Sequence, residues 1–543
     1  MLKKIFCCLF INLTAMSALR AQTPGLNHHE ELPMPVLIES NGRHQLLVDG
    51  KPFFIFGGQA HNSSGWPALL PHVWSAVARL NANTLEVPIY WEQIEPEQGR
   101  FDFSLIDTLL TQARDHDVRL VLLWFATWKN GSNHYMPSWM KLQPDRYPNC
   151  IGKDGKPIDS PSPIADATLE ADKKAFAAIM HHLRLADPRH TVILVQVENE
   201  PGSWGTVRDY SPAAQRLFEK AVPGALLKAD ILRALGHPGA AKGTWQQVFG
   251  KDADEYFHAW HVASFIGAVA AAGKAEYGLP LYANAALRDP LTNPPASYYE
   301  SGGPTDNVIP IWKIAAPAID ILSPDIYLDG NDKCLKVIDL YSRPDNALLV
   351  PECGLSPDKV KYIYPTLAHG GIGFSFFGID GNGDHADRLD PAPDLLSPIA
   401  KEYRLLAAPA ALLSQWAFED RIRAVVEPED HSAQSVALPG WQATIKFGTG
   451  RGDMRPNEHP TGKALIINLE KNVFLATGTL CRITFRPTGA DSTKAWQYLQ
   501  VEEGEYVDGV FKSRRILNGD ETDWGGPAFG STPVWLRISV IAR

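Results

Sequence analysis

The chain has 543 residues, of which 45% are hydrophobic and 21% charged, and its formal net charge is −10. This balance is typical of a soluble globular protein rather than a disordered one, and the length predicts two or three domains. The negative charge argues against a nucleic acid or an anionic membrane as partner, because both reward clustered lysine and arginine. A neutral substrate is easier to reconcile with it.

The first residues have the pattern of a secretory signal peptide. A short basic start precedes a mostly apolar stretch from Ile5 to Leu19, and small residues between Ala18 and Ala21 offer a cleavage region. The apolar stretch is too short to span a bilayer. We therefore expect a signal peptide over 1–21, a Pro-rich polar leader over 22–43, and a secreted or periplasmic protein. A buried N-terminal helix is the alternative.

Cysteine usage adds little to the functional interpretation. Cys150, Cys334, Cys353 and Cys481 would remain after cleavage, and export makes disulfides feasible, but one sequence does not determine their pairing. Their spacing is not that of a metal site. We predict no metal centre, and nothing in the sequence calls for a cofactor.

Alternating apolar and amphipathic segments predict an α/β fold. A hairpin with Asp49-Gly50 as its turn opens the pattern. Helical stretches then separate near-continuous apolar runs, as expected when both faces of a parallel sheet are covered. One such stretch carries Phe176, Ile179 and Leu183 at helical spacing. The apolar runs are Phe53–Gly58, Thr84–Ile89, Val118–Phe125, Val192–Val197, Leu279–Ala283, Ile319–Tyr327, Leu348–Pro351 and Ile372–Phe377.

Eight such units predict a (β/α)8 TIM barrel over 44–410. An open doubly wound sheet is the alternative, but no Gly-rich phosphate loop follows the first run. After about Leu413 the sequence changes to β-rich runs separated by Gly, Pro and Asp. This pattern predicts a sandwich-like all-β domain over 411–543. That domain could bind glycan or brace the barrel, and we favour bracing.

Two of the apolar runs end in a glutamate that the run itself does not explain. The fourth run leads into residues 197–201, with the sequence VENEP, and the seventh ends in Glu352. Barrel enzymes carry their chemistry at these strand ends. Alternation places Glu198 and Glu200 on one face, but it usually breaks at a strand end, so Asn199 and Glu200 can both reach the mouth. The alternative is that each glutamate forms a salt bridge or caps a helix.

A pair of opposed carboxyl groups is what retaining glycoside hydrolysis needs. One carboxylic acid protonates the leaving oxygen while the other attacks the anomeric carbon, and the two lie about 5–5.5 Å apart. The acid must keep its proton near neutrality, and the nearby negative charge of its partner favours that. The pattern therefore predicts a glycosidase.

These motifs resemble those of a clan of retaining barrel glycosidases that carry Asn-Glu on strand four and Glu on strand seven. Segments 57–61, 86–103 and 196–202 (QVENEPG) are similar to motifs of family 35 β-galactosidases, and the likeness covers residues 44 to 400. The resemblance implies Glu200 as general acid/base and Glu352 as nucleophile. It also implies that Asn199 holds the hydroxyl next to the anomeric carbon and that Tyr327 is hydrogen-bonded to the nucleophile.

The chain departs from that family in the third-strand loop. The family's Ala-Glu-Trp segment is Ala126-Thr127-Trp128-Lys129-Asn130 here, so a galactose-binding acid is missing. We expect the pocket to be completed differently. The substitutes we predict are Lys129, Asn130 and Glu92. Each of these three could instead be an ordinary polar residue of the surface. Further candidates for sugar contact or stacking are His61, Trp128 and Trp204. The alternative is a hydrogen-bonded structural role for His61 and ordinary packing for the two tryptophans.

Taken together, these patterns indicate an exo-acting retaining β-galactosidase. The resemblance is closest to a bacterial branch linked to removing galactose from xyloglucan, which would suit an exported enzyme. Two alternatives stay open: another retaining β-glycosidase of the glucanase or mannanase type, and a catalytically silent carbohydrate-binding protein. The expected partner is a β-galactoside or oligosaccharide substrate, and an oligomer is compatible with the sequence.

Overall fold

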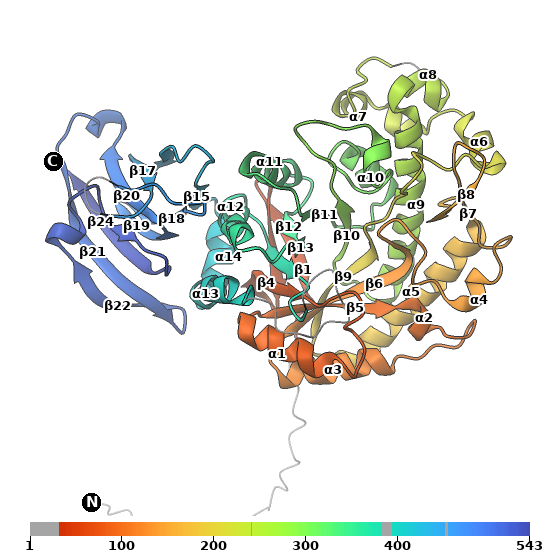
Figure 1. Ribbon diagram of the computed structural model, residues 1–543, viewed down its shortest axis with the longest axis horizontal. Coiled ribbons are helices and arrows are strands. Elements are labelled where there is room, and N and C mark those ends of the chain that lie inside the picture. Colours follow the sequence, from red (N-terminus) through yellow and green to blue (C-terminus); the bar gives the residue numbers. More distant parts are fainter. Residues whose placement is uncertain (1–31, 241, 382–393, 451–453) are drawn as a thin grey trace, which may run out of the picture.

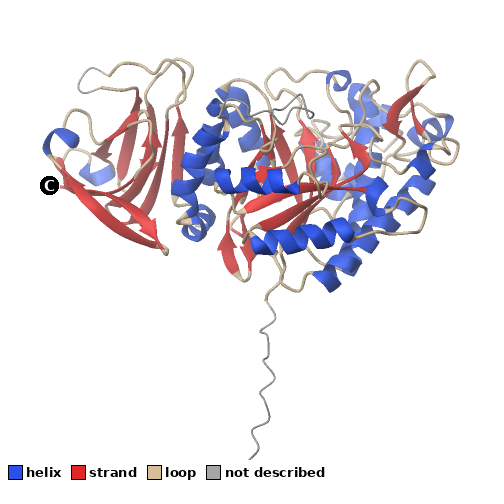
Figure 2. Cartoon of the chain, turned by 60° about the horizontal axis from the view of Figure 1, so that its bottom comes forward, coloured by secondary structure: helices blue, strands red, loops and turns tan. Residues whose placement is uncertain are grey.

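The computed structural model describes residues 32–240, 242–381, 394–450 and 454–543, so the predicted signal peptide lies outside the described residues. A helix-wrapped barrel and a C-terminal all-β part lie side by side (Figures 1 and 2). No helix of the described ranges is both long and apolar enough to cross a bilayer. The four described cysteines are buried free thiols.

A parallel sheet closes on itself to form the barrel. Its strand order is β12-β14-β4-β5-β6-β9-β10-β11-β13. β12 and β13 are two parts of one strand, because Pro351 lies between them and has no N–H to donate to a ladder. β12 pairs with β14 and β13 pairs with β11, which completes the circle. The (β/α)8 prediction is confirmed, and each of the eight predicted runs overlaps a strand. The barrel strands are β4 (Ile55–Gln59), β5 (Thr84–Tyr90), β6 (Arg119–Lys129), β9 (Val192–Asn199), β10 (Leu281–Ala286), β11 (Ile321–Ile326), β12 (Leu349–Val350), β13 (Glu352–Cys353) and β14 (Gly373–Phe377).

Helices form the outer layer of the barrel. The predicted stripe of Phe176, Ile179 and Leu183 lies on α5 and is fully buried, because α5 packs with α9 on the barrel. The α-helices are α1 (Leu70–Leu80), α2 (Trp91–Ile94), α3 (Ser104–Asp115), α4 (Ser138–Lys141), α5 (Asp166–Ala186), α6 (Pro212–Phe218), α7 (Ala229–Ala234), α8 (Trp245–Phe249), α9 (Ala253–Glu276), α10 (Ile309–Ala315), α11 (Asn331–Tyr341), α12 (Ile363–Ala368), α13 (Leu396–Ala407) and α14 (Ala410–Phe418). Short 3₁₀ helices are η1 (Gly224–Leu227), η2 (Gly250–Asp252), η3 (Ala296–Tyr298), η4 (Pro357–Tyr362), η5 (Gly489–Asp491) and η6 (Gly519–Glu521).

Two small antiparallel sheets accompany the barrel. β1 (Val36–Ser40), β2 (Arg43–Val48) and β3 (Lys51–Phe53) form a three-stranded sheet, and β7 (Asn149–Ile151) pairs with β8 (Pro157–Pro161). The predicted hairpin is β2–β3. Asp49 and Gly50 have φ of 52° and 72°, the left-handed pair that a type I′ turn requires.

The C-terminal part is a sandwich of two antiparallel sheets, as predicted. A six-stranded sheet has the order β15-β18-β19-β24-β21-β22, and a four-stranded sheet has the order β16-β17-β20-β23. Ile445 and Phe485 of the smaller sheet share one core with Ile466 and Phe474 of the larger. The strands are β15 (Ile422–Val426), β16 (Gln434–Leu438), β17 (Trp441–Phe447), β18 (Lys463–Glu470), β19 (Val473–Thr479), β20 (Cys481–Pro487), β21 (Trp496–Val507), β22 (Val510–Leu517), β23 (Ala528–Phe529) and β24 (Trp535–Ala542).

The outer face of the larger sheet packs on the barrel, and we call this contact the seam. Alternate residues of β18 divide between the two cores: Ile466 faces the sandwich, while Leu465 and Ile467 belong to the barrel's cluster. Lys463 on β18 forms a buried ion pair of 2.7 Å with Glu402 on α13. This shared core is what we expect of a domain that braces the barrel.

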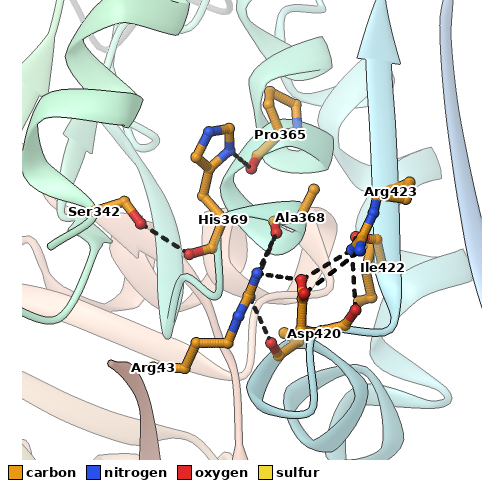
Figure 3. A network of polar contacts seen from close by, with 9 residues as sticks. Arg43, Ser342, Pro365, Ala368, His369, Asp420, Ile422 and Arg423 are labelled. Atoms are coloured by element: carbon orange, nitrogen blue, oxygen red, sulfur yellow. Dashed lines mark hydrogen bonds and ion pairs between the residues drawn. The ribbon is translucent and has the colours of Figure 1, made fainter. Parts of the chain in front are cut away.

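A polar network also fastens the connection between the two parts (Figure 3). Arg43 on β2 donates to the carbonyl of Ala417 at 2.8 Å and to the Asp420 carboxylate. Arg423 on β15 donates to the same carboxylate at 2.9 Å. Asp420 lies between the last barrel helix and the first sandwich strand, so two cations hold this turn in place.

Candidate active site

The backbone at the end of β9 turns sharply, which separates Glu198 from Glu200. Both residues have left-handed φ, 66° and 44°. Glu198 is buried against the outer layer: its carboxylate accepts the backbone N–H of Trp128 at 2.7 Å and neighbours Asp172 of α5. Glu200 lies at the barrel mouth, where its backbone N–H donates to Asn284 Oδ1 at 2.9 Å. The broken alternation therefore places Glu200, and not Glu198, at the mouth.

The turn that follows needs glycine at one position. Gly202 has φ of 141°, and a Cβ there would lie 2.8 Å from the carbonyl oxygen of Ser301. No L-residue is comfortable with either condition. The close approach of these two loops fixes the wall next to Glu200.

Glu352 reaches the same mouth from β13. Its side chain accepts a hydrogen bond of 2.9 Å from Gln59 Nε2 and another from the Tyr327 hydroxyl. Two donors, one at the end of β4 and one directly after β11, hold the carboxylate in one orientation, as a nucleophile requires. The predicted contact of Tyr327 with Glu352 is therefore present.

Three carboxyl groups meet at the mouth. One oxygen each of Glu200, Asp325 and Glu352 lies within 4.8 Å of those of the other two, and all three residues are buried. Asp325 and Glu352 are register partners on the neighbouring strands β11 and β13. Three acids at this spacing could also hold a cation, so the expectation of no metal stays a prediction.

Burial raises the pKa of these acids. The pKa of Glu200 rises from its ordinary value of 4.5 to about 7, because the side chain is buried and the charge of Glu352 is close. The pKa of Asp325 rises well above its usual range for the same two reasons, with Glu200 contributing as well. On β5, burial raises the pKa of the fully buried Glu86 to about 8. A protonated Glu200 near neutrality is the state that a general acid requires.

The structure brings most of the predicted binding residues to Glu200. Asn130 donates to the Glu200 carboxylate, and Lys129 donates to Asn130 Oδ1. Asn199 is fully buried beside Glu200, and neither its amide oxygen nor its amide nitrogen has a partner among the described residues. Trp204 is 47% exposed and is held by its Nε1 on Glu300. An exposed indole next to the acid offers a face for a sugar ring.

The other three predicted binding residues are Trp128, Glu92 and His61. The prediction that Trp128 stacks on a sugar is wrong, because its side chain is fully buried and offers no free face. Its ring centroid lies 4.9 Å from that of Phe265 on α9. Its position at the end of β6 points it into the helix layer. Glu92 is exposed on α2, with its backbone held by the carbonyl of Tyr135. His61 lies beside Phe377 at the ends of β4 and β14, and its ring centroid is 5.2 Å from that of Phe377.

Sequence reasoning missed several groups that shape the site. Gln59 and Glu86 stand within the segments 57–61 and 86–103 that carried the resemblance, and Asp325 lies two residues before Tyr327, so these positions were a usable signal. Asn284 and Glu300 gave no such signal. Glu300 comes from a loop 100 positions beyond Glu200, yet its buried carboxyl lies close enough for the charge of Glu200 to raise its pKa.

A cavity of about 460 Å³ opens next to Glu200. Its walls come from the ends of β10 and β11 and the segments after them, and include Leu287, Leu328 and Lys333. Lys333 is paired with Asp289 at 2.8 Å. Asp325 and Tyr327 also line the cavity, so it borders the cluster of three carboxyl groups.

Comparison with known proteins relates parts of the chain to β-galactosidases. The family 42 glycoside hydrolase model, described as beta-galactosidase, matches residues 72–232, and a domain of unknown function, DUF5597, matches residues 399–528. Beta-galactosidase 14 of Arabidopsis thaliana is 26% identical over 28% of this chain and 17% of that protein. A beta-galactosidase of Xanthomonas manihotis is 26% identical over 37% of this chain and 32% of that protein.

Among solved structures, the cold-adapted beta-galactosidase of Rahnella sp. R3 has 16% identity and a TM-score of 0.48, covering 68% of this chain and 60% of that one. In each of these three comparisons the match spans less than two thirds of the relative's own length. The family 42 match includes Glu200 but not Glu352.

Proposed function

We propose that the protein is an exported, exo-acting retaining β-galactosidase of the family 35 type that removes galactose from plant cell-wall oligosaccharides such as xyloglucan. The observation that carries the proposal is the meeting of Glu200 and Glu352 at one mouth, with carboxylate oxygens within 4.8 Å. That spacing suits double displacement better than the wider separation of inverting enzymes. The β-galactosidase comparisons support the sugar, and the QVENEPG motif supports the family.

In the first step, a Glu352 carboxylate oxygen attacks the anomeric carbon while the bond to the leaving oxygen breaks. The Glu200 carboxyl gives its proton to that oxygen, and a covalent glycosyl-enzyme remains. In the second step, Glu200 takes a proton from water, the water oxygen attacks the anomeric carbon, and Glu352 is released. Because its pKa is raised to about 7, Glu200 is largely protonated up to neutral pH and can supply the proton for the first step.

Other residues would hold the sugar. The unpaired amide of Asn199 can hydrogen-bond a ring hydroxyl, which would satisfy a buried polar group. Lys129 and Asn130 stand where the family has its galactose-binding acid, and Trp204 offers a face for stacking. The cavity lined by Leu287 and Leu328 would receive the leaving group.

The covalent step can be tested with a 2-deoxy-2-fluoro galactoside that carries a good leaving group. We expect stoichiometric labelling of the protein, with the modified peptide containing Glu352, and retained configuration in the product by NMR. Glu200→Ala should still form the glycosyl-enzyme from activated aryl galactosides, whose leaving groups need no proton, but it lacks the base of the second step. Azide, a nucleophile that needs no base, should restore its turnover. Labelling elsewhere, or inverted product, would refute the mechanism.

A panel of aryl glycosides and xyloglucan oligosaccharides tests the substrate. We expect release of galactose alone. Preference for glucosides or mannosides, or release of longer fragments, would point to a glucanase or mannanase. Binding of oligosaccharide without any hydrolysis would support a silent binding protein.

A further inference from the structure

Asp325 is the third acid of the mouth, and the double-displacement scheme assigns it no role. It lies on β11 directly beside Glu352 in the sheet register and is 1% exposed. Its carboxyl also contacts that of Glu200. One of its oxygens lies within 4.8 Å of a carboxylate oxygen of each proposed catalytic group, so its charge state bears on both.

Asn284 links Asp325 to Glu200. The Asn284 amide nitrogen donates to Asp325 Oδ2 at 2.6 Å, and the Asn284 amide oxygen accepts the backbone N–H of Glu200 at 2.9 Å. Once the amide is oriented by that backbone N–H, it presents its N–H to Asp325. One oxygen of Asp325 is thereby satisfied.

The other oxygen, Oδ1, is buried and receives no N–H or O–H from an amide, hydroxyl or amine of the described residues. The groups around Asp325 offer it no positive charge. From β9, β13, β10, β11 and α11 these groups are Glu200, Glu352, Asn284, Tyr282, Tyr327 and Tyr341. Two lysines lie near the mouth, but Lys129 donates to Asn130 and Lys333, which lines the cavity next to Glu200, is paired with Asp289. A contact between two carboxyl groups becomes a hydrogen bond only when one of them carries a proton.

We propose that Asp325 is a positioning residue that stays a neutral carboxylic acid and donates its O–H from Oδ1 to the carboxylate of Glu200. Burial and the charges of Glu352 and Glu200 raise its pKa well above the usual range, in agreement with this state. After Glu200 has given up its proton, the O–H of Asp325 stabilises the carboxylate that must act as base in the second step. The inference rests on the proposed roles of Glu200 and Glu352.

The pH profile of kcat/KM separates a neutral from an ionised Asp325. Asp325→Asn keeps a neutral donor for Glu200 and an acceptor for Asn284, so the alkaline limb should stay in place. Asp325→Leu removes the donor, which should raise the pKa of Glu200 and shift the alkaline limb to higher pH. It should also lower kcat/KM about 10- to 100-fold, the size of one hydrogen bond to a charged group. If Asp325 is ionised, both variants lose a negative charge, the pKa of Glu200 falls and the alkaline limb shifts to lower pH, which overturns the proposal.

An infrared difference spectrum gives a readout independent of catalysis. At neutral pH, wild type minus Asp325→Asn should show the carbonyl stretch of one protonated carboxylic acid. Glu402→Gln, which removes a buried acid paired with Lys463, serves as the control and should leave that band unchanged. Absence of the band in the Asp325 difference refutes the neutral acid even if the protein proves not to be a glycosidase. Normal turnover in Glu352→Gln would instead refute the proposed function and leave the band unaffected.

Discussion

The mouth of the barrel and its seam with the sandwich both bury acids, but the groups that surround those acids differ. At the seam, the Glu402 carboxylate forms an ion pair of 2.7 Å with the Lys463 amine and accepts a hydrogen bond of 3.1 Å from the Tyr364 hydroxyl. At the mouth, Glu200 and Asp325 lie close to each other and to Glu352, and burial and the charge of Glu352 raise the pKa of both, although Asn130 and Asn284 donate to them. Burial of an acid alone therefore does not indicate chemistry. Burial next to other acids at an open mouth is the stronger sign, because it shifts the protonation state toward one that a reaction can use.

The largest effect should separate the two regions by activity. Glu352→Gln removes the attacking oxygen, so kcat should fall at least about 10⁴-fold on every galactoside, as when a nucleophile is removed from other hydrolases. Glu402→Gln is the matched control at the seam and should keep kcat. Steady-state kinetics on a chromogenic galactoside measures both. Comparable losses of kcat in the two variants would show that the mouth and the seam do not differ in catalytic importance.

Stability should show the reverse ranking. Glu402→Gln leaves the Lys463 amine buried without its counter-ion, which should cost about 3–5 kcal/mol of unfolding free energy. Denaturant unfolding followed by fluorescence measures this change. Glu352→Gln keeps the shape of the side chain and its two neighbours, so its unfolding midpoint should stay close to that of the wild type. A seam variant as stable as the wild type would argue against the bracing role.

The pH dependence should report the raised pKa at the mouth. Because Glu200 must be protonated to act as acid and its pKa is about 7, kcat/KM should fall about tenfold per pH unit above pH 7. Rates measured with a substrate whose leaving group needs no proton provide the control. A flat profile up to pH 9 would contradict the assignment.

The same shift affects stability. The folded-state pKa lies above the ordinary 4.5, so the unfolded chain ionises first and stability falls as pH rises from about 4.5 to about 7. Glu200→Gln should therefore raise the melting temperature at pH 8 and lose this advantage at pH 4.

The smallest effect concerns metals. Glu200, Asp325 and Glu352 are close enough to hold a cation, but a double displacement uses Glu200 as a proton donor and Glu352 as a free nucleophile. Prolonged treatment with a chelator should leave kcat unchanged. Loss of activity that is restored by a divalent cation would assign the three acids to a metal centre.

The sequence by itself predicted the barrel, the sandwich and the two glutamates. Its eight near-continuous apolar runs are typical of strands covered on both faces, and two acids at the ends of such strands favoured chemistry over salt bridges or helix caps. The hairpin turn at Asp49-Gly50 was equally predictable from the sequence, because its conformation depends on two adjacent residues.

Only the tertiary structure decided what surrounds those glutamates. Asp325, Asn284 and Gln59 meet them across strand neighbours that lie far apart along the chain, and Trp128 packs against a helix more than 100 positions later. The neutral or charged state of an acid depends on which donors reach it in three dimensions. Local sequence carries no record of those donors, so the protonation of the mouth follows from the closed barrel alone.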